Sequence, residues 1–233
     1  MIQASAIEAV CSALTLRILF HHVQLLELLE GKTTTDLQAV ANAAPGRLPA
    51  WAKFVGGPNA VLPGDQATAT VDLPAGNYAL MCLIPDQTGV PHAVLGMVKP
   101  LIVTPTGIRK VVALKSDVRV TQWDFAFSLS DPITAGSHTI EVTNAGSQRH
   151  EVVVVKLAPG ATAKDFGAAL EQGGLGVPPG LPVGGIVGLE RGGHGTFTGH
   201  FVPGQYGLIC FFVDKKTGAP HFIKGMPLDF VVK

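Results

Sequence analysis

The sequence predicts an all-β protein in which one domain design is used twice. A pattern recurs about 129 residues along the chain: GNYALMCLIPDQTGVPHAVLGM ends at Met97, and GQYGLICFFVDKKTGAPHFIKGM ends at Met226. The chain of 233 residues also contains 28 Gly and 17 Pro, which favours many short strands joined by turns over a helical fold. A repeat of this length indicates two domains of a little over 100 residues each.

The repeated residues are of the types that bind metals. Each copy holds a Cys, then a His preceded by Pro, then a Met preceded by Gly, and another His lies upstream of each copy. Thiolate, imidazole and thioether are soft ligands that suit copper. The candidate metal ligands are therefore His21, Cys82, His92 and Met97 in the first half, and His150, Cys210, His221 and Met226 in the second.

The second half gives the clearer pattern of elements. Alternating apolar and polar residues predict strands over 119–129 and 137–144, and a run of β-branched residues predicts a buried strand over 151–157. Thr162 and Asp165 form a Thr-x-x-Asp capping box that predicts a short helix. The remaining expected elements are a Gly/Pro-rich connection over 173–185, strands over 195–201 and 204–210, and a closing strand over 226–233.

The first half follows the same order but starts short. Thr33 and Asp36 repeat the capping box, and residues 14–19 (LTLRIL) are expected to form a strand before His21. No convincing counterpart of the strand over 119–129 precedes it. A missing strand would leave an exposed sheet edge or require a substitute partner. We therefore expect a domain lacking its first strand over 1–105, a linker over 106–116 and a complete domain over 117–233.

Both halves resemble the cupredoxins, the β-sandwiches that include plastocyanin, azurin and the type 1 domains of copper nitrite reductases. The resemblance is carried by the string Gly-x-Tyr-x-x-x-Cys…Pro-His-x-x-x-Gly-Met, and in the second half also by VTNAGSQRHEV. It covers 117–233 and roughly 20–105. The loop between Cys and His is longer than in plastocyanin-type carriers and is nearest to the nitrite reductase type.

The resemblance implies two tandem Greek-key sandwiches, the N-terminal one incomplete, with a type 1 copper site in each. Cys and two His would form a trigonal plane, and Met would be the axial ligand. His22 is an alternative to His21 in a shifted register. The His at the end of each loop, His92 or His221, would be partly exposed as the electron exit.

The function expected from this resemblance is copper binding with one-electron transfer to a redox partner protein. Two other hypotheses remain open: a metal-free binding or structural module on the same scaffold, and a copper carrier or storage protein. The resemblance also places the protein in the periplasm or outside the cell. A homo-oligomer is compatible with the sequence.

Other classes of function are disfavoured. Lys and Arg number 17, as do Asp and Glu, so no net charge attracts nucleic acid or an anionic membrane. No apolar run is long enough to span a bilayer. In cupredoxin enzymes a His adjacent to the Cys leads to a catalytic copper, and neither Cys82 nor Cys210 has one, so we expect no enzyme activity. His194 and His200 are interpreted as surface residues.

Overall fold

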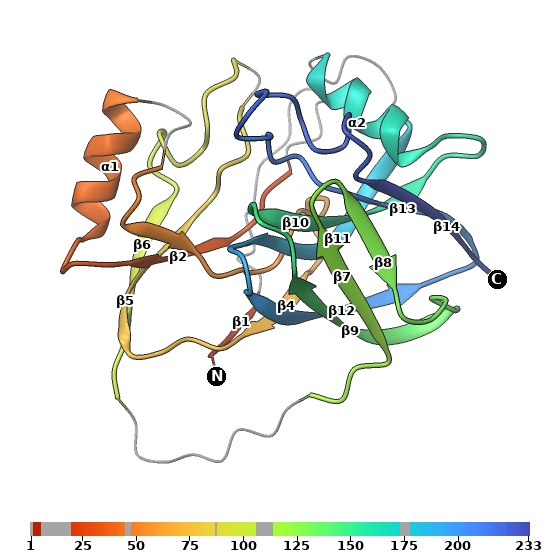
Figure 1. The fold of residues 1–233 in the computed structure, drawn as a ribbon, viewed down its shortest axis with the longest axis horizontal. Coiled ribbons are helices and arrows are strands. Elements are labelled where there is room, and N and C mark those ends of the chain that lie inside the picture. The colour runs from red at the N-terminus through yellow and green to blue at the C-terminus, as the bar shows by residue number, and fades with distance from the viewer. Residues whose placement is uncertain (1, 6–19, 45–47, 87, 106–113, 173–177) are drawn as a thin grey trace.

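The computed structural model is mainly β, as the sequence predicts, with two short helices among the residues it describes (Figure 1). It describes residues 2–5, 20–44, 48–86, 88–105, 114–172 and 178–233. The strand expected over 14–19 and most of the expected linker therefore lie outside the described residues. Within the described part of the chain, neither helix has the length and hydropathy needed to cross a membrane.

Each half contains one helix and a set of strands. The first half comprises β1 (Ile2–Ser5), β2 (Gln24–Leu28), α1 (Thr34–Ala43), β3 (Ala52–Phe54), β4 (Thr68–Val71), β5 (Gly76–Met81) and β6 (Val98–Val103). The second comprises β7 (Val118–Trp123), β8 (Ala126–Leu129), β9 (Gly136–Asn144), β10 (His150–Leu157), α2 (Ala163–Glu171), β11 (Gly180–Leu189), β12 (His194–Phe201), β13 (Gly204–Ile209) and β14 (Pro227–Val232). Figure 1 shows α1 and α2 on opposite sides of the molecule.

The strands form three sheets, two of which have the same strand order. In the first half the order is β3-β2-β5-β6, and in the second half it is β11-β10-β13-β14. The third sheet has six strands in the order β1-β4-β12-β9-β7-β8, so it contains strands from both halves. Strand β12 of the second half is thus the neighbour of β4 of the first.

Equivalent strands of the two halves pair with each other. Strands β4 and β12 run antiparallel with Ala69 opposite Phe197, residues that are 128 positions apart, like the sequence repeat itself. The segment after β3 pairs antiparallel with β11, and there Pro58 lies opposite Ile186, again 128 positions apart. When two copies of one segment pair antiparallel and equivalent residues face each other, a two-fold axis runs between those residues. The two halves are therefore related by a pseudo-two-fold axis that passes near both pairs.

The main hydrophobic core is shared between the halves. Leu25, Ala69 and Val71 of the first half belong to the same buried cluster as Ile140 and Val154 of the second. A core that draws on both halves cannot be fully formed by either half alone, because each would expose part of its apolar face to water. Two smaller clusters, one per half, pack under the helices and beside the loops that carry Cys and His.

The stretch expected to be a Gly/Pro-rich connection is in part a strand, so that prediction was wrong. β11 begins at Gly180 and pairs with β10 through shifts in register. It lies at the edge of its sheet, where Pro182, which has no N–H to donate, is tolerated. Both predicted capping boxes are confirmed: Thr33 is the N-cap of α1, and Thr162 is the N-cap of α2.

Candidate metal centre

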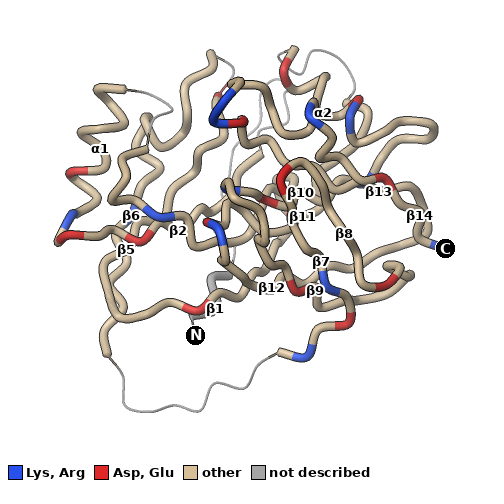
Figure 2. Tube along the Cα trace, in the orientation of Figure 1, with Lys and Arg blue, Asp and Glu red and all other residues tan. Residues whose placement is uncertain are grey.

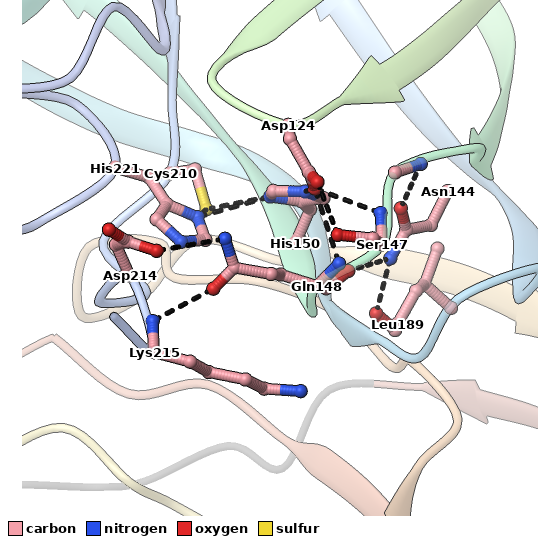
Figure 3. A network of polar contacts seen from close by, with 11 residues as sticks. Asp124, Asn144, Ser147, Gln148, His150, Leu189, Cys210, Asp214, Lys215 and His221 are labelled. Carbon is pink, nitrogen blue, oxygen red and sulfur yellow. Dashed lines mark hydrogen bonds and ion pairs between the residues drawn. The ribbon is translucent and has the colours of Figure 1, made fainter. Parts of the chain in front are cut away.

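In the second half, three candidate ligands meet at one end of two neighbouring strands (Figure 3). His150 opens β10, Cys210 directly follows β13, and His221 lies in the loop that leads to β14. The Sγ atom of Cys210 is 3.5 Å from Nδ1 of His221 and 4.0 Å from Nδ1 of His150. The two Nδ1 atoms are 3.1 Å apart. All three side chains are buried, so three soft donor atoms converge on one small space away from water.

The first half repeats this arrangement. The Sγ atom of Cys82 is 3.5 Å from Nδ1 of His92 and 4.0 Å from Nδ1 of His21. The two imidazole rings lie with their centroids 4.7 Å apart, against 4.8 Å for the pair in the second half. The two clusters, defined by His21, Cys82 and His92 and by their counterparts, thus have the same distances from Sγ to the two Nδ1 atoms.

The long loops between Cys and His fold back on themselves in the same way. A bridge joins Pro85 to Pro91 in the first loop, and a bridge joins Val213 to Pro220 in the second. Each bridge closes a short turn, so the additional residues project away and the His returns to the strand end. The longer spacing is therefore compatible with a compact cluster.

A buried carboxylate holds the second loop in place. Asp214 accepts a hydrogen bond from Gln148 Nε2 at 3.0 Å (Figure 3). It also accepts from Thr217 Oγ1 at 2.7 Å and from Lys224 Nζ at 2.5 Å. The bond from Lys224 is the leading cause that holds the pKa of Asp214 well below its usual range. The loop is thus tied both to the segment before His150 and to the segment after His221. In the first loop, Asp86 accepts bonds only from within the loop, among the described residues.

Asp124 fixes the orientation of one ligand candidate, and sequence reasoning missed it. Its Oδ1 accepts a hydrogen bond from His150 Nε2 at 2.9 Å (Figure 3). A proton on Nε2 leaves the lone pair on Nδ1, which faces Cys210, and such carboxylate partners are typical of metal-binding His. Burial alone would raise the pKa of Asp124, but the hydrogen bonds from Ser147 and His150 outweigh it and lower that pKa to about 2.

The carboxylate and the imidazole pack against a glycine. A Cβ atom on Gly146 would lie 2.6 Å from Asp124 Oδ1 and 2.6 Å from His150 Nε2, which is closer than real contacts allow. This glycine belongs to the turn that Asn144 organises, where the Asn144 side chain accepts from Gly146 N at 2.9 Å and donates to Gln148 O at 2.8 Å. The turn therefore positions His150, and its glycine leaves room for the Asp124 carboxylate beside the imidazole.

In both halves, the side chain that follows the upstream His accepts a hydrogen bond from the backbone N–H of the residue that follows the Cys. His22 Nε2 accepts a hydrogen bond from Leu83 N at 2.9 Å, and Glu151 Oε1 accepts one from Phe211 N at 3.1 Å. The alternative that assigns His22 as a ligand is therefore not what the structure shows, since His21 lies in the cluster. Burial lowers the pKa of His22 to about 3 and raises that of Glu151 to about 7.

The protonation states suit the binding of a soft cation. Burial, together with the neighbouring His150, lowers the pKa of His221 to about 4, so its imidazole is neutral at pH 7. Burial also lowers the pKa of His21, His92 and His150. The same desolvation raises the pKa of both thiols. A buried thiol keeps its proton until a cation takes its place, and so metal binding would release protons.

The two candidate axial ligands differ in exposure. Met226 is fully buried, whereas Met97 is 38% exposed. Each Met is held near the loop His of its own half, because the backbone N–H of the Met donates to the carbonyl of that His at 3.0 Å. The prediction that the loop His would be partly exposed is wrong for both halves: His92 is buried, and His221, which makes an edge-to-face contact with Phe125, is 0% exposed. Axial ligation remains a prediction.

The other histidines stand apart from the clusters. Among the described residues, the two clusters are the groups of His, Cys, Asp and Glu close enough to hold a metal ion. His194 and His200 lie exposed on β12, where His194 approaches Asp72 at 3.8 Å and His200 contacts Ser137 at 3.1 Å. The interpretation of both as surface residues agrees with these positions.

The chain thus has an all-β fold with the same sheet order in each half, and in each half a Cys lies close to two His. No family model and no curated protein sequence matches the chain. Among solved structures, the chain is similar to reduced auracyanin from Roseiflexus castenholzii, with a TM-score of 0.36 and 22% identity over 49% of this chain and 94% of auracyanin. It is also similar to the blue copper oxidase from Nitrosomonas europaea, with a TM-score of 0.27 and 16% identity over 92% of this chain and 69% of the oxidase.

Proposed function

We propose that this protein binds copper at both clusters and carries single electrons. The observation that carries the proposal is the donor geometry, repeated in both halves. Metal–ligand bonds of roughly 2.0–2.3 Å at 120° to one another place neighbouring donor atoms about 3.5–3.7 Å apart. The observed separations between Sγ and Nδ1 are 3.5 Å and 4.0 Å in each cluster, and the two Nδ1 atoms of the second cluster are 3.1 Å apart. These separations lie on either side of the expected range, so shifts of a few tenths of an ångström would let each cluster hold one trigonally bound ion.

The donor set favours copper over other metals. One thiolate and two imidazoles with a weak thioether accept both oxidation states of copper with little rearrangement, and such a site supports electron transfer. The protein would supply the remaining requirement, which is a rigid and water-poor environment. In the second half this environment is provided by the buried positions of Cys210, His150 and His221.

A carrier is favoured over an oxidase. The residues adjacent to the two Cys are Met81 and Leu83 in the first half, and Ile209 and Phe211 in the second, so no imidazole leads from either thiolate to another metal. We further propose a protein redox partner and a location outside the cytoplasm, which the resemblance to cupredoxins supports. Oxygen uptake by the copper-loaded protein in the presence of a reductant would contradict the carrier proposal.

The test is a titration of the metal-free protein with Cu(II), followed by visible absorption. We expect an intense thiolate-to-copper band that Cys210→Ser and Cys82→Ser each reduce and that the double variant abolishes. His200→Ala, which removes an exposed imidazole outside both clusters, should leave the band unchanged. Binding of Cu(I) without a coloured Cu(II) form would instead indicate a copper carrier or storage protein. No binding, with both thiols free, would leave a metal-free module.

A further inference from the structure

The two clusters have the same distances from Sγ to Nδ1 but differ in how far they are shielded from solvent. In the second half His150, Cys210 and His221 are 0% exposed. In the first half Cys82 and His92 are also buried, but His21 is partly exposed, and Met97 beside the cluster is 38% exposed. A difference of this kind, in two copies of one design, calls for an element that covers only one of them.

That element is the turn of the β7–β8 hairpin. Its two tip residues, Asp124 and Phe125, each contact a different imidazole of the second cluster. Asp124 accepts the hydrogen bond from His150, and the ring of Phe125 lies edge-on to His221 with the ring centroids 5.3 Å apart. The described part of the first half places no strand pair at the corresponding position.

The backbone conformation of Phe125 is unfavourable for a residue with a bulky side chain. Its φ of 67° lies in the left-handed region, where a bulky side chain is an outlier that costs about 1–2 kcal/mol. Such conformations persist where the surroundings impose them, and they concentrate at functional sites. Here two neighbours contact the ring: Lys224 Nζ lies 4.1 Å from its centroid, and the His221 ring packs against it in a T-shaped arrangement.

The imidazole of His221, which packs against the Phe125 ring, has an unpaired nitrogen within the described part of the chain. His221 Nε2 is buried and has no hydrogen-bond partner among the described residues. An unpaired buried polar atom costs about 1–3 kcal/mol. The strained backbone and the unpaired nitrogen both oppose stability, so the cover is not explained by packing alone.

We propose that the β7–β8 hairpin closes the second centre to solutes, so that the first centre is the one that exchanges with the surroundings. Asp124 acts as a positioning residue, and Phe125 acts as the barrier. The difference in access is a property of the metal-free chain. Its consequence, that metal and electrons pass between protein and solution at the first centre, rests on the proposed copper function.

The first test is alkylation of the metal-free protein by iodoacetamide, followed by peptide mass spectrometry. Cys11→Ser is the background, because it removes the third thiol. We expect Cys82 to react faster than Cys210, and Phe125→Gly to raise the rate at Cys210 by about tenfold or more through easier local opening. Glycine suits the left-handed backbone, so this variant should fold. The rate at Cys82 should not change.

Trp123→Ala is the matched control, because Trp123 lies on the same hairpin, is 49% exposed and bonds to Ser128. It should leave both alkylation rates unchanged. Equal rates at the two thiols in the parent protein would overturn the proposal, as would a rate at Cys210 that Phe125→Gly leaves unchanged.

The second test uses the copper-loaded protein and the Cu(I) chelator bicinchoninate. Removal should be biphasic, and Cys82→Ser should eliminate the fast phase. Phe125→Gly should accelerate the slow phase by about tenfold or more, with the same physical cause. A single phase from both sites would contradict the exchange role of the first centre. A chain that takes up no copper but still shows the two alkylation rates would refute the proposed function and leave the cover intact.

Discussion

Ala69 and Phe197 are equivalent residues of the two halves, and they face each other as partners in the central sheet. The same self-pairing recurs where Pro58 meets Ile186. A duplicated chain can thus join its copies as a two-fold dimer would, with like strands antiparallel across the axis. The arrangement gives β4 a partner in β12 and merges the apolar faces of both halves into one core.

The shared core predicts that the halves of the metal-free protein unfold together. The chain has two Trp residues, Trp51 in the first half and Trp123 in the second. Trp51→Phe leaves a fluorescence probe of the second half, and Trp123→Phe leaves a probe of the first. Urea unfolding followed in the two variants should give coincident transitions after correction for any stability change. Two separated midpoints would show that the halves are independent domains.

Asn59 should be a strong link between the halves. It is 2% exposed, and its Nδ2 donates to Glu151 Oε2 and Val152 O at 3.1 Å and to Ile186 O at 3.3 Å, all in the second half. Asn59→Ala leaves these buried acceptors without their donor, so we expect a loss of about 1–3 kcal/mol in the free energy of unfolding. Chemical denaturation measures this loss.

Asn42→Ala is the control for that experiment, because Asn42 lies exposed on α1 and bonds only to Gln38 among the described residues. It should change the free energy of unfolding by less than about 0.5 kcal/mol. Equal effects of the two substitutions would mean that the contact across the halves contributes nothing specific.

The capping boxes should contribute equally in the two halves. The Thr33 and Thr162 hydroxyls accept from the backbone N–H three residues on, at 3.3 Å and 3.1 Å. Thr33→Ala and Thr162→Ala should each lower the free energy of unfolding by about 1 kcal/mol. Thr162→Ser keeps the hydroxyl and should retain most of that stability. A serine variant as unstable as the alanine variant would exclude the cap as the cause.

The stability that the capping box of α2 contributes should decrease at acidic pH. The hydroxyl of Thr162 is the leading cause that lowers the pKa of Asp165 below its ordinary value of 3.8. A carboxyl whose pKa is lower in the folded state stabilises the fold above the unfolded pKa, and the effect disappears as the pH falls through the folded one. The difference in stability between wild type and Thr162→Ala should therefore shrink below about pH 4.

Features encoded by short stretches were predictable from the sequence. The capping boxes need only two residues three apart, and the repeat of Cys, His and Met is visible without any structure. In the second half the candidate ligands converge because His150 and Cys210 lie at neighbouring strand ends and the loop after Cys210 brings His221 back to them. The same logic failed at β11, where glycine and proline concealed a strand that its partner β10 stabilises.

Features that depend on distant segments were not predictable. Asp124 is 26 positions from His150, and nothing in its immediate sequence marks it as a partner of that imidazole. The positive φ of Phe125 carries no sequence signal either, since glycine or asparagine is expected there. The pairing of Ala69 with Phe197 arises only when both copies are folded.

The most local test of the second centre is Gly146→Ala. The added methyl group would lie 2.6 Å from both Asp124 Oδ1 and His150 Nε2, so the hydrogen bond between them must break or shift. Loss of such a carboxylate partner typically lowers metal affinity about 10–100-fold. In a Cys82→Ser background, copper titration should show this loss at the second centre. In a Cys210→Ser background, the first centre should bind copper as before.

Gly76→Ala is the matched control, because a Cβ atom there would find its nearest neighbour, the Tyr78 ring, at an ordinary 3.6 Å. It should affect neither centre. If Gly146→Ala fails to fold, Asp124→Asn tests the same bond without adding an atom, and it should weaken copper binding at the second centre alone. An affinity that neither variant changes would show that Asp124 does not position His150 for the metal, whatever the geometry of the metal-free cluster.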